Sequence, residues 1–324
     1  MTITAPRLDP RLSRSSIISA LVLVASVSAI LGLTAVIIGP NTAQAAFLSI
    51  MLLLSPVRAA QSSTRGAAAL LAVLVAIGGF LLGPLGLNAV LAGVVLVSIA
   101  QAFFRLGDVA TMTRAPVNLL AFAGLATTGA ELWQVVLGTV VGAAFTLVLA
   151  RLLPPSETPP TVGSLRDRLD DGIALALGAV LIVVLAEWAD FPFAGWALLS
   201  LCMIVTVGGE ARTSRSVERV VGTILGAVLA TLVSFAPAPW PLVAALLCGV
   251  LAVAYLRQGT YAMFAMFLTP AVLLTSTTDL TAVQLGIRRI EAVLAAAVIA
   301  MVLTTIVGAL QRRRSAAARD AAAD

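Results

Sequence analysis

The stretch from Glu218 to Ala227 reads ERVVGTILGA and places an arginine ahead of two small-residue pairs, Gly222-Thr223 and Gly226-Ala227. Upstream, GTVVGA repeats the pattern of its last six residues. Small residues four apart lie on one face of a helix and let another backbone approach closely. The sequence therefore predicts four helix-packing residues, which are Gly138, Gly142, Gly222 and Gly226.

The chain is apolar enough to lie in a lipid bilayer. Of its 324 residues, 60% are hydrophobic and 11% are charged, about half the charged fraction of a soluble domain. The 20 basic residues are all arginine and are scattered between apolar runs, which argues against a nucleic-acid partner. There is no histidine, and we find no catalytic constellation, metal-ligand spacing or phosphate loop. We therefore expect no enzyme activity, no metal and no cofactor.

The apolar runs predict an all-α polytopic membrane protein with about 12 transmembrane helices. An even number of spans places both termini on one side. Most arginines fall in the tails or in the connections on that side, which predicts cytoplasmic termini. The predicted spans are 17–38, 43–57, 65–83, 87–104, 108–129, 132–152, 172–188, 192–208, 217–236, 239–256, 259–277 and 284–309.

A proline-rich segment divides the chain into two halves of similar length. The predicted parts are a cytoplasmic tail, a six-helix repeat, a cytoplasmic linker, a second six-helix repeat and a basic cytoplasmic tail, at 1–16, 17–151, 152–171, 172–311 and 312–324.

The opening pattern recurs on the third, sixth, ninth and twelfth predicted helices. The four copies start at Arg65 (RGAAALLAV), Val135 (VVLGTVVGA), Arg219 (RVVGTILGA) and Arg288 (RRIEAVLAA). The repeat unit is thus three helices, and an odd number of helices inverts its orientation. The pattern predicts two parallel six-helix repeats, each of two inverted three-helix units, as in many secondary transporters.

The motif R-x-x-G-T-x-x-G at Arg219 resembles the signature of fusaric acid resistance protein-like (FUSC) membrane proteins, which group with aromatic acid exporters and are distantly similar to plant malate channels. The resemblance covers 17–311 and is strongest over 172–311. It implies a bacterial inner-membrane transporter that exports organic anions, often aromatic carboxylates. Many relatives carry large cytoplasmic domains, and we expect none in this sequence.

Charge inside a membrane span is costly and therefore points to function. In the copy on the twelfth helix, Glu291 occupies the slot that is Ala68, Gly138 and Gly222 elsewhere. A carboxylate there predicts a proton-coupling group, with Arg288 one turn earlier as a substrate-binding residue. The alternative is an ion pair at the outer rim of the membrane.

The fifth predicted helix offers a second polar group. If Pro116 and Pro270 break their helices at matching depths, Asp108 lies in the membrane as a second proton-coupling candidate, beside the substrate-binding candidates Arg114 and Asn118. The alternative is that this helix begins at Ala115 and has Pro116 in its first turn.

Two short predicted helices supply three further substrate-binding candidates. Ser49 and Ser200 occupy matching positions in the segments FLSIMLL and LLSLCMI. Trp196 either stacks on an aromatic substrate or belongs to the interfacial tryptophan belt.

Three hypotheses of function remain open at this stage. The first is a proton-coupled exporter of organic anions, the second a passive anion channel, and the third a non-transporting component of a membrane assembly. The predicted partners are the lipid bilayer and a small organic anion; a homodimer and a periplasmic adaptor are both left open.

Overall fold

The computed structural model describes residues 11–59, 62–106, 109–110, 114–152, 165–205, 209–276 and 279–320. The chain divides into two compact units, and each is treated by itself. Unit 1 comprises residues 1–30 and 210–298, and unit 2 comprises residues 31–209 and 299–324.

Unit 2 contains the helices from the second to the eighth. They are α2 (Pro40–Ala59), α3 (Ser62–Leu82), the 3-10 turn η1 (Gly83–Leu85), α4 (Leu87–Ala102), α5 (Ala115–Leu125), α6 (Leu132–Leu152), α7 (Leu165–Trp188) and α8 (Ala194–Val205). The two-residue strands β1 (Arg105–Leu106) and β2 (Val109–Ala110) pair between α4 and α5. A core of small and aromatic side chains joins α2, α3, α5 and α6 around Phe122.

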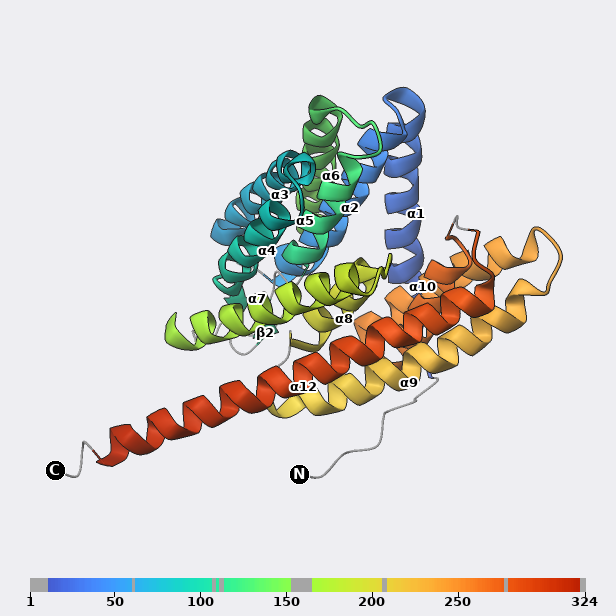
Figure 1. Cartoon of the computed structure of the whole chain (residues 1–324). Helices are drawn as coiled ribbons and strands as arrows, with labels where there is room; N and C mark the ends of the chain where they lie inside the picture. Colours follow the sequence, from blue (N-terminus) through green and yellow to red (C-terminus); the bar gives the residue numbers. More distant parts are fainter. Residues whose placement is uncertain are drawn as a thin grey trace. The chain divides into compact units, whose positions relative to one another are not determined.

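Unit 1 contains most of the remaining helices. They are α1 (Arg14–Ile37), α9 (Gly209–Ser234), α10 (Trp240–Gln258), α11 (Tyr261–Leu273) and α12 (Ala282–Asp320), with the ends of α1 and α12 assigned to unit 2. In Figure 1, α9 and α12 run side by side along much of their length.

The prediction of an all-helical membrane protein is confirmed, since the described residues form twelve α-helices. Seven of these are long and apolar enough to cross a membrane. The apolar parts of α2, α4, α5, α8 and α11 are shorter than the roughly 20 residues that a span needs. Four of these five are the second helix of a predicted three-helix unit. The two-repeat arrangement itself, and the boundaries derived from it, stay predictions.

The fifth helix differs from the predicted span 108–129. It begins at Ala115 and has Pro116 in its first turn, where a proline needs no backbone N–H donor. The prediction that Pro116 breaks a helix inside the membrane is therefore wrong. Pro270 lies inside α11, which continues through it to Leu273.

The small-residue pairs lie against the backbones of neighbouring helices. A Cβ on Gly222 would overlap the carbonyl oxygen of Ala262, and one on Gly226 would overlap that of Met266, both on α11. In unit 2, Gly138 and Gly142 approach α2 in the same way, at the carbonyl oxygens of Thr42 and Ala46. Two helix pairs, α9 with α11 and α6 with α2, thus share one mode of close approach.

Pro270 explains part of the contact at Gly226. Its ring nitrogen cannot donate a hydrogen bond to the carbonyl oxygen four residues earlier, which belongs to Met266. That oxygen lies against the Cα of Gly226, where a weak Cα–H···O contact can replace the missing bond.

We expect Gly226→Ala to lower the melting temperature, because the added methyl group overlaps backbone that cannot move without shifting α11. Overpacking of this kind typically costs about 1–3 kcal/mol. The matched control is Gly249→Ala on α10, where an added Cβ would meet nothing within 4 Å. Thermal unfolding in detergent measures both, and equal melting of the two variants would contradict the close contact.

Candidate anion-binding site

The buried charged side chains in the described part of the chain are all arginines, and all three belong to unit 1. Arg219 and Arg289 are each 1% exposed, and Arg212 is 6% exposed. No aspartate or glutamate is buried among the described residues. The interior of this unit therefore carries permanent positive charge.

Three of the arginines lie on one face of α9. Arg212, Arg215 and Arg219 follow one another at intervals of three and four residues, and Thr223 continues the same face. Glu218, one residue before Arg219, is partly buried. The face thus leads from the start of the apolar span into its interior.

Arg289 approaches this face from α12. Gly286, three residues before Arg289 on α12, lies against Ala227 of α9. In Figure 1, α12 starts beside the end of α9 and runs back along it. The two helices are therefore antiparallel. We call Arg215, Arg219, Arg289 and Tyr261 the arginine cluster.

The positions of the two buried arginines place them well inside their spans. Arg219 lies about 10 Å beyond Arg212, the first residue of its apolar span, at 1.5 Å per residue. Arg289 lies about as far beyond Ala282, the first residue of the other. Because the helices are antiparallel and Gly286 lies against Ala227, Arg289 is level with about residue 224 of α9, roughly 7 Å along the helix axis from Arg219.

Tyr261, the first residue of α11, closes the cluster on a third side. The guanidinium carbon of Arg215 lies 4.1 Å from the centre of its ring, a cation–π contact. The Tyr261 side chain is 2% exposed and that of Thr223 is 1% exposed. Neither hydroxyl has a hydrogen-bond partner among the described residues. The interior of unit 1 therefore holds two hydroxyl oxygens that make no hydrogen bond with the described residues.

The ion pair on α12 lies on a different face. Arg288 donates to the Glu291 carboxylate over 3.1 Å, and the two side chains are 51% and 48% exposed. The prediction that Glu291 occupies a close-packed slot is wrong, because Ala292, at 2% exposed, lies on the packed face instead.

The error has a simple origin in the register of the repeat. If the pattern on α12 is counted from Arg289 instead of Arg288, Arg289 matches Arg219, Ala292 matches Gly222 and Ala296 matches Gly226. All three are buried on α12. The sequence analysis therefore missed Arg289. The spacing of Arg289, Ala292 and Ala296, at three and four residues, could have identified it, because it matches the spacing of Arg219, Gly222 and Gly226.

The second predicted group of residues lies in unit 2. Arg114 precedes α5 and donates a hydrogen bond to the backbone carbonyl of Met51 on α2. Its guanidinium also contacts the sulfurs of Met51 and Met203. Asn118 is 3% exposed and donates to the Arg114 carbonyl oxygen. Arg114 thus connects α2, α5 and α8.

The remaining predicted residues lie in local contacts. Ser49, on α2, donates to the Thr139 carbonyl oxygen of α6. Ser200 donates to the Trp196 carbonyl oxygen within α8, and the Trp196 ring stacks on Phe193 at 4.3 Å. Asp108 falls outside the described residues.

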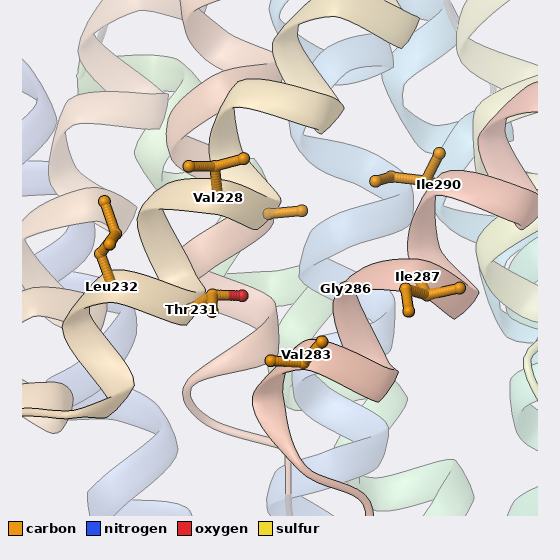
Figure 2. Close-up of a pocket in the computed structure, with 8 residues that line it drawn as sticks. Val228, Thr231, Leu232, Val283, Gly286, Ile287 and Ile290 are labelled. Atoms are coloured by element: carbon orange, nitrogen blue, oxygen red, sulfur yellow. The ribbon is translucent and has the colours of Figure 1, made fainter.

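A shallow pocket between α9 and α12 is shown in Figure 2. It is lined by Ala227, Val228, Thr231, Leu232, Val283, Gly286, Ile287 and Ile290. The lining is apolar except for the hydroxyl of Thr231, so this pocket offers no charge to an anion.

Comparison with known proteins bears on the region that holds the arginine cluster. Residues 179–303 match the fusaric acid resistance protein-like family model. The predicted resemblance is therefore confirmed over these residues, which include α9, α10, α11 and most of the apolar span of α12. No curated protein and no solved structure matches the chain. The match covers 125 of the 324 residues, and seven helices of the described chain are long and apolar enough to cross a membrane.

We expect Arg114→Gln to destabilise unit 2, because the bond to Met51 is lost and a shorter side chain fills the space. Loss of a hydrogen bond from a charged group costs about 1.5–3 kcal/mol. Arg151→Gln, at an exposed arginine in the last turn of α6, is the control. Equal thermal unfolding of the two variants would show that Arg114 does not hold the helices together.

Proposed function

We propose that this protein is a secondary transporter that exports organic carboxylate anions, aromatic ones among them, across the bacterial inner membrane. The single observation that carries the proposal is the burial of Arg219 and Arg289 at 1% exposure, with no buried carboxylate in the described residues. Charged residues inside membrane spans commonly mark substrate pathways. An arginine guanidinium matches the geometry of a carboxylate and binds it through charge-assisted hydrogen bonds.

Two further observations support the proposal. The cluster lies within the residues that match the fusaric acid resistance protein-like family. Arg219 and Arg289 also each lie about 10 Å inside an apolar span, and charged residues inside membrane spans commonly mark substrate pathways. Cytoplasmic termini, inferred from the arginine distribution, would place Arg212 at the cytoplasmic end of α9.

Transport of radiolabelled benzoate into proteoliposomes tests the proposal. Arg219→Gln and Arg289→Gln each remove a guanidinium, and loss of a charged hydrogen bond weakens binding about ten- to a hundredfold. We expect the initial rate at low benzoate concentration to fall by a comparable factor. Arg151→Gln, which removes an exposed arginine, is the matched control. Wild-type rates in both cluster variants would contradict the proposal.

A passive anion channel is the second candidate. It is favoured by the absence of a buried titratable acid among the described residues, because a channel lined by arginine needs no proton carrier. An imposed pH gradient distinguishes the two. A proton-coupled carrier accumulates benzoate above its external concentration, whereas a channel only equalises the concentrations.

Glu291 is the residue that the sequence analysis predicts as the first proton-coupling group. Because its side chain is 48% exposed and paired with Arg288, we expect Glu291→Gln to leave both the pH dependence of transport and the melting temperature nearly unchanged. The pH profile of benzoate uptake checks this. A profile that becomes flat in the variant would restore Glu291 as the coupling group.

A further inference from the structure

The start of α1 is hydrogen-bonded to the end of α10 within unit 1. The Gln258 side-chain amide donates a hydrogen bond to the Arg11 carbonyl oxygen over 2.6 Å and accepts one from the Ser13 backbone N–H over 3.4 Å. The Ser13 hydroxyl in turn accepts a hydrogen bond from the Ser16 backbone N–H in the first turn of α1. We call residues 11–14 the N-terminal strap. One side chain of α10 thus holds the strap at two backbone groups.

This contact places the strap at one surface of the membrane. Both α1 and α10 are long and apolar enough to cross a bilayer, and Arg14 is the first residue of one apolar span while Gln258 is the last residue of the other. Because hydrogen bonds join the start of α1 to the end of α10, these two ends lie on the same side of the membrane. The polar headgroups flank a hydrocarbon core roughly 30 Å thick. The strap therefore lies at the level of the headgroups.

The strap and the adjoining end of α10 carry positive charge. Residues 11–14, α10 and α11 contain Arg11, Arg14 and Arg257 and no acidic residue. Arg11 and Arg14 are exposed, and Arg257, next to Gln258, is half-buried. Asp9 is the acidic residue that precedes the strap in sequence. A surface with this charge is complementary to an anionic partner in the plane of the headgroups.

We propose that the N-terminal strap and the end of α10 form a docking surface for anionic phospholipid headgroups. A basic residue at the membrane surface favours anionic lipid about fivefold. An arginine guanidinium also matches the oxygens of a phosphate group through paired hydrogen bonds. The Gln258 bonds keep Arg11 and Arg14 at this surface and beside Arg257. The inference does not depend on the proposed function, because it concerns residues outside the arginine cluster.

Fluorescence quenching beside the strap tests the inference on the full-length protein. Cys202 and Cys248 are buried, so Ser15→Cys, at an exposed position in the first turn of α1, lets a fluorophore be attached selectively. The labelled protein is placed in phosphatidylcholine vesicles that contain a brominated lipid, either phosphatidylglycerol or phosphatidylcholine at the same mole fraction. The bromine atoms quench a fluorophore that lies close to them.

We expect brominated phosphatidylglycerol to be enriched beside the label about fivefold or more over brominated phosphatidylcholine. High salt should reduce the enrichment, because it screens the exposed charges. Equal quenching by the two lipids at low salt would overturn the inference.

Variants locate the charge that attracts the lipid. Arg11→Gln combined with Arg14→Gln should bring the two brominated lipids close to equal quenching. Gln258→Ala keeps every charge but removes both bonds to the strap, so its enrichment should fall between that of the wild type and that of the double variant. Arg151→Gln, at an exposed arginine in the last turn of α6, is the matched control and should keep the wild-type enrichment.

Two results with these variants would contradict the assignment. Wild-type enrichment in the double variant would show that the strap is not the lipid-binding surface. Wild-type enrichment in Gln258→Ala would show that the contact with α10 does not organise that surface.

Discussion

Arg219 and Arg289 carry positive charge inside helices that otherwise present apolar side chains, and each such burial costs about 3 kcal/mol on membrane-insertion scales. Among the described residues, the buried charged side chains are confined to unit 1. The buried arginines fall on one helix pair, and the aromatic ring of Tyr261 closes the third side. An arginine side chain stays protonated in proteins, whereas a carboxylate can gain a proton and become neutral. A site built from arginines is therefore positive at every physiological pH, which suits an anion and makes proton uptake by the site itself unnecessary.

Close backbone packing is what brings the charges together. Gly222 and Gly226 allow α9 to lie against α11, and this contact sets Tyr261 beside the arginine face of α9. Pro270 leaves the Met266 carbonyl oxygen without its helical donor, at the point where Gly226 approaches. In unit 2, Gly138 and Gly142 make the same kind of close contact. The residue three positions before Gly138 is Val135, whereas the residue three positions before Gly222 on α9 is Arg219. Unit 2 thus has the packing without the arginine at this position, and its half-buried Arg114 bonds to the Met51 carbonyl oxygen elsewhere in the unit.

The sequence predicted the class of fold well because hydrophobicity over long runs decides membrane insertion, whatever the tertiary contacts. It also predicted, from R-x-x-G-T-x-x-G at Arg219, the resemblance to the fusaric acid resistance protein-like family that is found over residues 179–303, and it predicted the close-packing positions. The prediction of the buried arginine on α12 failed because it depended on a shift of one residue. Arg288 and Arg289 are neighbours in sequence, but the helix turns by about 100° per residue, so the Arg288 side chain is exposed and the Arg289 side chain is buried. Glu291 was misassigned for the same reason. Arg212 falls between the predicted spans 192–208 and 217–236, but α9 begins at Gly209 and includes it, and its side chain is buried. The helix start at Ala115 was one of two alternatives that the sequence left open.

The most direct test of this account is a structure of the protein with an iodinated benzoate, in which the heavy atom marks the ligand without ambiguity. The account predicts iodine density between α9 and α12, with the carboxylate within hydrogen-bond distance of the Arg219 or the Arg289 guanidinium. Iodine density at Arg114 in unit 2, or a protein carboxylate contacting both cluster guanidiniums in place of the ligand, would contradict it.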